Sequence, residues 1–513
     1  MSKYLMGIDA GCTSTKAVIF DEFGNEITSS STLSTRVKPR GKGFEEFDVD
    51  ALWTSTSKCI KEAVEKAKIN PKDIAGIGVC SFGNGIVVLD KEGNAAAPGA
   101  FSHDYRANDI IDMYKKKGSY DKINEIIKGT LFAGEPGPLL CWFKKYEPEV
   151  YNKIGAVLMF KDLIMYRLTD VFATDANVFG GSSMMNLGKL EYSKELLDLY
   201  EIPEMYDKLP KLAIESSEIV GRVTKEASQL TGLAEGTPVV GGMMDILACL
   251  VGAGATAPGV ITAIAGTWCI NETHSENIIP GASANMPFLT RGKYLNCSFT
   301  GASGVNYEWF NRALGGTATL EANNRGVSPY KVLDELIDLV PVGKTQVIYH
   351  PFVAQPSVHE NARANFFNID QNTSYAEIAY SIVEGVAFMH RQHINFLKNS
   401  GCEAKVIRLT GGVARSKVWA RVFADVLELP IEVVDCEEVG ALGVAITAGV
   451  GAGLYDSYED AFKKAVRIRK PFMPNIDTFD IYGKRFREWE RLIEIMKIYW
   501  NKNQISKHTD KLI

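Results

Sequence analysis

Apolar and polar residues alternate along the chain with two different periods. Residues 4–11 and 15–21 are apolar runs separated by a short polar turn, which is typical of a β-hairpin. From Leu52 to Ala67 apolar residues recur at helical spacing, which predicts a helix that Asp48 or Asp50 can cap. Strand-like and helix-like stretches alternate in this way throughout, so the pattern indicates an α/β fold.

The second half of the chain repeats this alternation. Residues 260–271 are expected to form a strand, a small-residue turn with a hydroxyl group, and a second strand, as in the first hairpin. Residues 374–396 predict an amphipathic helix that begins with a capping box, and 440–449 predict a helix of small residues that allows close packing. The similar turns predict two stacked α/β domains, 1–250 and 251–513, with a cleft between them.

The composition excludes a disordered, a collagen-like and a coiled-coil protein. The chain has 513 residues, of which 46% are hydrophobic and 23% are charged, as in an ordinary globular protein. Its 56 lysines and arginines stand against 62 aspartates and glutamates, which gives a net charge of −6. Because a protein that binds the phosphate backbone normally carries a basic face, we expect no nucleic-acid partner.

One uncharged stretch, residues 246–266, has about the length of a membrane span. Glycines and a proline interrupt it, so it fits a helix, a turn and a buried strand better, and we expect a soluble protein without a membrane segment. Residues 1–11 lack the pattern of a signal peptide. The nine cysteines form no CxxC pair and no metal-ligand spacing, which favours reduced thiols in the cytoplasm.

The first candidate for chemistry is the hairpin turn of residues 9–16. Its backbone N–H groups and hydroxyls suit phosphate oxygens, Lys16 adds a positive charge, and Asp9 at the strand end can hold the water shell of a metal ion. An ordinary turn rich in glycine, serine and threonine is the alternative for these residues taken alone. The chain contains no GxxxxGK[ST] loop, so it is not a P-loop NTPase.

A second candidate is Asp245, which follows the apolar run 238–240 and two glycines. A carboxylate at the end of a buried strand costs free energy unless it is used, which points to catalysis. The alternative is an N-cap for a helix over 246–251, and the two roles are compatible.

A third candidate is the pair Asp104 and Arg106. Side chains two residues apart on an extended segment point the same way, so this pair offers an acceptor and a donor fork suited to hydroxyl groups. A surface salt bridge is the alternative.

These motifs occur together in one order that resembles the FGGY family of carbohydrate kinases, a branch of the actin-like ATPase superfamily. The resemblance extends from about residue 4 to residue 450. Its arrangement is most similar to the branch that contains L-xylulose and 3-keto-L-gulonate kinases. It rests on GIDAGCTSTKAVIFD, GIGVCSFGNGIVVLD, SHDYRA, FKDLIMYRLTD, TDAN, GTPVVGGMMDILACLVGAGA, AGTWCIN, EGVAFMH, RLTGGVARSKVWARVFADVLELPI and GALGVAITAG.

The resemblance implies two actin-like (ribonuclease H-like) α/β domains with a central ATP cleft, and a need for ATP and Mg²⁺. It implies that Asp245 is the catalytic base and that Asp9 orients Mg²⁺. The implied sugar contacts, besides Asp245, are Gly83, Asn84, Asp104 and Arg106. The implied ATP-binding residues are Cys12, Thr13, Ser14, Lys16, Gly266, Thr267, Gly304, Gly412 and Ser416.

Two positions depart from the family pattern. Cys12 stands where threonine or glycine is usual, which removes a hydroxyl but keeps the backbone N–H, so we expect ATP binding to survive. Residues 81–85 stand in place of the Arg-Glu pair of glycerol kinases and of the bulkier sugar contacts of xylulose kinases. The missing Arg-Glu pair argues against a glycerol kinase.

The expected reaction is phosphorylation of a small open-chain sugar, a ketopentose such as L-xylulose, at a terminal hydroxyl. Other acyclic substrates stay open, namely erythritol, gluconate or a pentanedione-type signal molecule. A non-catalytic sugar sensor is a further alternative, although Asp9, Asp245 and both turns argue against it, and SHDYRA argues against an actin-like ATPase that acts on proteins. Family members are monomers, dimers or tetramers, and a homodimer stays open here.

Overall fold

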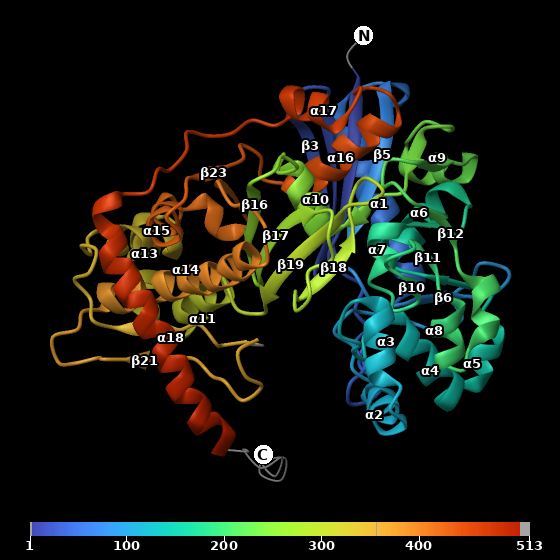
Figure 1. Cartoon of the computed structure of the whole chain (residues 1–513). Helices are drawn as coiled ribbons and strands as arrows, with labels where there is room; N and C mark the ends of the chain where they lie inside the picture. The colour runs from blue at the N-terminus through green and yellow to red at the C-terminus, as the bar shows by residue number, and fades with distance from the viewer. Residues whose placement is uncertain (1–2, 355–356, 503–513) are drawn as a thin grey trace. The chain divides into compact units, whose positions relative to one another are not determined.

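The chain folds into two units, which a computed structural model describes for residues 3–354 and 357–502 (Figure 1). Each unit has its own β-sheet with helices packed on it, as the α/β pattern predicts. The chain enters each unit more than once. Unit 1 comprises Met1–Thr256, His274–Asn296 and Cys436–Arg467, and unit 2 comprises Ala257–Thr273, Cys297–Asp435 and Ile468–Ile513.

The sheet of unit 1 begins with the predicted hairpin, whose two strands are antiparallel. The third strand of the chain continues this antiparallel pairing, whereas β5 (Ile74–Ser81) pairs in parallel with β1 (Tyr4–Ala10). On its other edge, β5 pairs in parallel with β14 (Pro238–Val240) and, closer to its end, with β15 (Met243–Met244). The order along the sheet is β13 (Ile219–Arg222), β14 (Pro238–Val240), β5 (Ile74–Ser81), β1 (Tyr4–Ala10), β2 (Ser14–Asp21) and β3 (Glu26–Leu33).

One face of this sheet packs on α1 (Val49–Ala67). Successive side chains of a strand point to opposite faces, so Met6 and Ile8 of β1 lie on one side of the sheet. There they share a core with Leu52 and Ile60 of α1, and all four are buried. The apolar stripe predicted for this helix is therefore its sheet-facing side.

The other face of the sheet packs on α16 (Val439–Gly451). A Cβ on Gly7 would lie 1.9 Å from the Ala441 carbonyl oxygen, so the helix backbone lies directly on the strand. This contact ties Cys436–Arg467 to unit 1. The two units consequently do not divide at one point between residues 250 and 251.

Two helices begin with the side-chain caps that the sequence predicts. Asp48 accepts a hydrogen bond of 2.8 Å from the Ala51 N–H at the start of α1. Ser374 and Glu377 form a reciprocal capping box at the start of α14 (Tyr375–Asn399). Both predictions are confirmed.

Unit 1 also contains shorter helices and strands. The helices are α2 (Asn108–Lys117), α3 (Tyr120–Ile127), α4 (Pro136–Tyr146), α5 (Pro148–Lys153), α6 (Phe160–Thr169), α7 (Ala176–Gly180), α8 (Lys194–Leu199), α9 (Lys225–Thr231), α10 (Asp245–Gly252) and α17 (Tyr458–Ala465). Short strands β4 (Glu46–Phe47) and β7 (Gly99–Ala100) pair with each other, as do β6 (Val87–Leu89) and β8 (Ala156–Leu158), and β9 (Ala173–Asp175) and β12 (Lys211–Ala213).

Unit 2 repeats the strand–turn–strand arrangement. Five strands lie in the order β19 (Tyr294–Thr300), β17 (Cys269–Ser275), β16 (Val260–Ala265), β22 (Val406–Thr410) and β23 (Ile431–Val433). The pair β16 and β17 is the second hairpin that the sequence predicts. The helices around this sheet are α11 (Val305–Leu314), α12 (Gly316–Arg325), α13 (Pro329–Asp338), α14, α15 (Lys417–Leu427) and α18 (Phe479–Lys502).

The uncharged stretch 246–266 is not a single helix. It consists of α10, a turn and the buried strand β16, as predicted. Within residues 3–354 and 357–502, no helix combines the length and the apolar character that a membrane crossing needs.

Candidate functional site

Strand register brings the two carboxylates of unit 1 to one place. Asp9, near the end of β1, lies opposite Cys80 of β5, and Met243 of β15 lies opposite the same cysteine on the other edge. Asp245 immediately follows β15 and begins α10. Since the carboxyl ends of parallel strands meet at one edge of a sheet, Asp9 and Asp245 flank the end of β5.

Asp245 is the first residue of α10 and is partly exposed. Its Oδ1 atom accepts a hydrogen bond of 2.8 Å from the Ile246 N–H. Met244 is the N-cap residue, so the alternative in which Asp245 caps a helix over 246–251 is wrong by one position. Removal from water, followed by the charge of Asp9, raises the pKa of Asp245 to about 7.

Buried polar contacts hold the loop that precedes Asp245. The Lys161 ammonium donates to the Gly241 carbonyl at 2.7 Å, and the carboxylates of Asp162 and Asp175 lie 2.8 and 3.0 Å from it. The two carboxylates thus compensate the positive charge of the Lys161 ammonium, which is completely buried.

A buried amide fixes the same loop one residue before Asp245. Asn177 Oδ1 accepts from the Met244 N–H at 2.9 Å, and its amide nitrogen donates to the Pro287 carbonyl at 2.7 Å. Sequence reasoning noted the motifs FKD and TDAN but gave these positioning residues no role.

Asp9 lies in an environment that suits a hydrated cation. Burial raises its pKa, whereas Lys16, its cross-strand partner, lowers it. A Cβ on Gly440 would lie 2.9 Å from Asp9 Oδ2, so the glycine keeps a side chain away from the carboxylate. Among the described residues, no group of three or more His, Cys, Asp or Glu side chains is placed to hold a metal. The arrangement fits Mg²⁺ held through one carboxylate, waters and phosphates.

Lys16 is already paired within unit 1. Its ammonium lies 2.7 Å from both carboxylate oxygens of Glu438, which immediately precedes α16. No local pattern could indicate this partner, because the two residues are 422 positions apart.

The first hairpin turn is closed by a backbone hydrogen bond and has an exposed residue at its tip. The Gly11 N–H donates to the Ser14 carbonyl at 2.9 Å, and Thr13 at the tip is exposed. Burial and then the charge of Asp245 raise the pKa of the Cys12 thiol to about 12, so it stays protonated at neutral pH.

Asn84 sits in a strained turn beside the Asp245 loop. Its φ of 64° is left-handed, and its Oδ1 atom is buried without a hydrogen-bond partner in the described part of the chain. At the preceding residue, a Cβ on Gly83 would lie 2.0 Å from Met244 Cε. Gly83, which is predicted for sugar binding together with Asn84, therefore lies against Met244, the residue before Asp245.

Asp104 and Arg106 form a buried pair, so the surface salt bridge considered from the sequence is wrong. The Arg106 Nη2 atom lies 2.6 Å from Asp104 Oδ2 and 2.9 Å from Glu46, and Asp104 also accepts from the Glu45 N–H. The guanidinium lies 4.1 Å from the centre of the Phe44 ring. These contacts already use both carboxylate oxygens.

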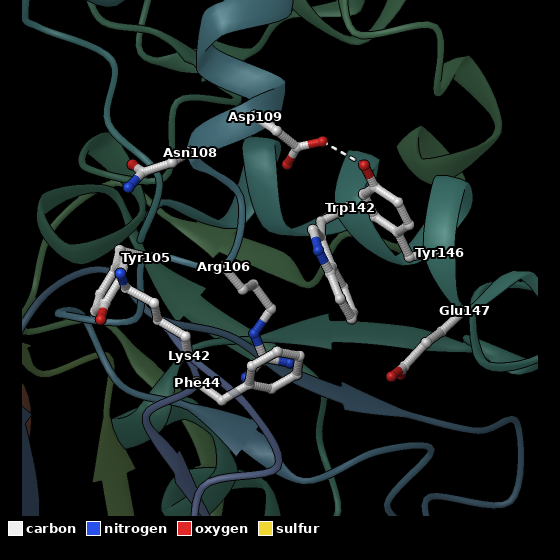
Figure 2. Close-up of a pocket in the computed structure, with 9 residues that line it drawn as sticks. All are labelled: Lys42, Phe44, Tyr105, Arg106, Asn108, Asp109, Trp142, Tyr146 and Glu147. Atoms are coloured by element: carbon white, nitrogen blue, oxygen red, sulfur yellow. Dashed lines mark hydrogen bonds between the residues drawn. The ribbon is translucent and has the colours of Figure 1, made fainter. Parts of the chain in front are cut away.

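Arg106 of this pair lines a cavity of about 550 Å³, and Figure 2 shows its side chain next to Phe44 and Trp142 there. Its lining residues are Lys42, Phe44, Tyr105, Arg106, Asn108, Asp109, Trp142, Tyr146 and Glu147. Acids and bases are mixed in this lining, so it presents no single charge to a ligand.

In unit 2, backbone hydrogen bonds connect the segments that contain the candidate nucleotide-binding residues Gly266, Thr267 and Gly304. The Gly304 N–H donates to the Gly266 carbonyl at 2.6 Å, and the Ser303 N–H donates to that of Thr267 at 3.1 Å. Gly412 is exposed, and a Cβ added to it would meet no atom within 4 Å. Bare backbone of this kind lets a flat or anionic ligand approach closely.

Ser416 also stabilises the start of a helix. Its hydroxyl accepts from the Trp419 N–H at 3.2 Å and so caps α15.

The predicted site residues thus fall into two groups. Unit 1 contains Asp9, Cys12, Thr13, Ser14, Lys16, Gly83, Asn84, Asp104, Arg106 and Asp245, and unit 2 contains Gly266, Thr267, Gly304, Gly412 and Ser416.

Comparison with protein families covers most of the chain. The N-terminal domain of the FGGY family of carbohydrate kinases matches residues 4–252, and the C-terminal domain of that family matches residues 261–452.

Individual proteins agree with this match. The L-xylulose/3-keto-L-gulonate kinase of Escherichia coli (strain K12) is 28% identical, over 99% of this chain and 100% of its own length. The autoinducer-2 kinase of Enterobacter sp. (strain 638) is also 28% identical, over 95% and 93%. The crystal structure of gluconate kinase from Lactobacillus acidophilus matches with a TM-score of 0.87 at 21% identity, over 98% of this chain and 100% of that one. That likeness confirms the predicted fold of two actin-like domains.

Proposed function

Because the chain belongs to the FGGY family of carbohydrate kinases and is a sugar phosphotransferase, we propose that it phosphorylates a small open-chain sugar with ATP and Mg²⁺. The substrate class we propose is a ketopentose of the L-xylulose type, and the acceptor is a terminal hydroxyl group. An extended chain that reaches Asp245 presents its end there, which supports this regiochemistry.

The placement of Asp245 carries the proposal. It stands at the end of β15 with its carboxylate partly exposed, and Lys161 and Asn177 hold the loop before it. A carboxylate with a pKa near 7 is suited to accept the proton of a substrate hydroxyl. Since phosphoryl transfer has a loose transition state, much of this role is to aim the hydroxyl oxygen at the phosphorus atom.

Asp9 and the two turns are the proposed nucleotide side of the reaction. When bound, Mg²⁺ neutralises the charge that develops on the phosphate oxygens. Asp9 would hold it through waters, and the N–H groups of residues 12–14 would face the phosphates. Lys16, which Glu438 holds at 2.7 Å, would orient this turn as well as contribute charge. In unit 2 we assign Gly266, Thr267, Gly304, Gly412 and Ser416 to ATP.

The sugar side is proposed to consist of Gly83, Asn84 and Asp245. Asp104 and Arg106 belong to it as the buried pair that fixes the neighbouring loop. None of the nine cysteines, all of which lie within the described residues, forms a disulfide, and the compartment we propose is accordingly the reducing cytoplasm.

Relatives at equal identity have names that refer to L-xylulose, 3-keto-L-gulonate and autoinducer-2, and a similar structure is named a gluconate kinase. These substrates differ from one another by single hydroxyl or carboxylate groups, and an enzyme distinguishes such groups by a few hydrogen bonds. They are therefore the alternatives to test. A coupled ADP-release assay with Mg-ATP tests the proposal on ketopentoses, polyols and aldonates. Turnover on a ketopentose at a terminal hydroxyl supports it, and phosphate on a secondary hydroxyl of the product contradicts the regiochemistry.

A further inference from the structure

A buried histidine of unit 2 contacts the segment that holds the second hairpin turn. His390 lies on α14, within the EGVAFMH stretch of the sequence, and is completely buried. Its Nδ1 atom lies 2.8 Å from Asn271 Oδ1, and its Nε2 atom lies 3.1 Å from the Ser303 hydroxyl oxygen. Asn271 and Ser303 are completely buried as well. The proposed reaction gives neither His390 nor Ser303 a role.

Asn271 determines which nitrogen of His390 carries the proton. The Asn271 amide nitrogen lies 3.4 Å from the Ser298 carbonyl oxygen, which can only accept, so the Oδ1 atom of the amide faces His390. This oxygen requires a proton on Nδ1. Removal from water and, after it, the neighbouring His393 lower the pKa of His390 to about 3, so the ring is neutral and Nε2 is an acceptor. The Ser303 hydroxyl therefore donates to Nε2.

Ser303 connects His390 to the hairpin turn between β16 and β17. The Ser303 N–H donates to the Thr267 carbonyl at 3.1 Å, and the Gly304 N–H donates to the Gly266 carbonyl at 2.6 Å. A Cβ on Gly304 would lie 2.7 Å from the same Gly266 oxygen, so the two segments are in direct backbone contact. A shift of Ser303 would consequently move the turn.

These two hydrogen bonds also set the direction of N–H groups in the turn. The C=O and N–H of a trans peptide point in opposite directions, and the described residues contain no cis peptide. Since the carbonyls of Gly266 and Thr267 point toward residues 303–304, the N–H groups of Thr267 and Trp268 point away from them. Both residues are exposed. Neighbouring N–H groups on one side of an exposed turn are suited to phosphate oxygens.

We propose that His390 is a positioning residue for ATP. Through the Ser303 hydroxyl it fixes residues 303–304, which in turn aim the N–H groups of residues 267–268 at the phosphates. This inference rests on the proposed function, in which these segments bind ATP. It adds a residue that acts on the nucleotide without touching it.

The same helix contains a second buried pair of this kind, which provides a matched control. The Ser298 hydroxyl oxygen lies 2.7 Å from His393 Nδ1, and both residues are buried. Ser298 lies within β19 and not beside the turn. If the His390 contact served stability alone, loss of either pair should lower the free energy of unfolding and leave ATP affinity unchanged.

Asparagine and glutamine separate the two nitrogens of His390. The amide nitrogen of asparagine takes the place of Nδ1, so His390→Asn keeps a donor for Asn271 and loses the acceptor for Ser303. The longer glutamine reaches the position of Nε2, where its amide oxygen accepts from the Ser303 hydroxyl. His390→Gln therefore keeps the contact on which the proposal depends.

Calorimetry with Mg-ATP alone provides the first measurement. His390→Asn and Ser303→Ala should each weaken Mg-ATP binding about 5- to 20-fold, because each removes the same buried hydrogen bond. The double variant should bind no more than about twofold more weakly than either single variant. His390→Gln should bind within about threefold of wild type.

The control variants are His393→Asn and Ser298→Ala. They should bind Mg-ATP as wild type does, even where urea unfolding shows the same loss of stability as for His390→Asn. Equal weakening of Mg-ATP binding in both pairs, or wild-type affinity in Ser303→Ala, overturns the proposal. Ser303→Ala removes one hydroxyl group only, so it decides the question if His390→Asn fails to fold.

Turnover separates this inference from the proposed function. In the coupled ADP-release assay on ketopentoses, His390→Asn should raise KM for ATP by the same factor. KM for the sugar should stay unchanged, since these contacts lie in unit 2 and the proposed sugar residues lie in unit 1.

The two proposals fail in different ways. If Mg-ATP affinities change as predicted but no sugar is phosphorylated, the proposed reaction is wrong and the role of His390 stands. If a ketopentose is phosphorylated and His390→Asn keeps the wild-type KM for ATP, the role of His390 is wrong and the proposed reaction stands. A wild-type protein that binds no Mg-ATP overturns both.

Discussion

Asp245 lies close enough to Asp9 for the two carboxylates to interact, although 235 residues separate them in the chain. Removal from water and, after it, the charge of Asp9 bring the pKa of Asp245 to about 7. The register of β1, β5 and β15 creates this proximity. The geometry places the carboxylate proposed as the base beside the carboxylate proposed for Mg²⁺.

Replacement of Asp245 with asparagine tests the base directly. Asp245→Asn should lower kcat by about 10²- to 10⁴-fold, because the amide cannot accept the hydroxyl proton. ATP binding measured by calorimetry should stay within about threefold of wild type. Retention of more than a tenth of wild-type kcat would show that Asp245 is not the base.

The same variant should be more stable than wild type at neutral pH. A carboxyl whose folded pKa is raised keeps its proton in the native state while it ionises in the unfolded state, so the native state loses stability between about pH 4 and pH 7. With allowance for partial exposure, the stability advantage of Asp245→Asn should grow by about 1 to 2 kcal/mol from pH 5 to pH 8. Urea unfolding of the ligand-free protein measures this, and an advantage that shrinks with rising pH contradicts it.

Local sequence signals predicted the elements well because their causes are local. The Asp48 cap, the Ser374–Glu377 capping box and both hairpins depend on residues a few positions apart, and all are present.

Contacts between distant segments could not be predicted in this way. Glu438 reaches Lys16 only because α16 returns to the first sheet. Periodicity gives the apolar face of a helix but not the sheet on which it lies. Arg106 shows the same limit, since the sequence could not tell a surface pair from one enclosed by Phe44 and Glu46.

The geometry of Arg106 predicts an effect on stability more than on substrate affinity. Arg106→Lys keeps the charge but loses the fork that joins Asp104 to Glu46, so it should cost about 2 to 4 kcal/mol of unfolding free energy. KM for the sugar, measured below the melting transition, should change less than about threefold.

The exposed Arg325, which pairs with Glu335 at 2.7 Å, provides the control. Arg325→Lys should cost less than about 1 kcal/mol. A tenfold rise in sugar KM for Arg106→Lys without loss of stability would place Arg106 on the substrate instead.

Substitution of Gly412 tests the proposed nucleotide site with almost no expected effect on folding stability. A Cβ at this position meets no protein atom within 4 Å and the residue is exposed, so Gly412→Ala should unfold at the same temperature as wild type to within about 1 °C. If ATP approaches the bare backbone here, the added methyl group should collide with it and raise KM for ATP about tenfold, with sugar KM unchanged. Gly316→Ala is the matched control, because its Cβ is equally free of contacts and it begins α12 in the same unit. An unchanged KM for ATP in Gly412→Ala, or an equal rise in both variants, would remove Gly412 from the nucleotide site.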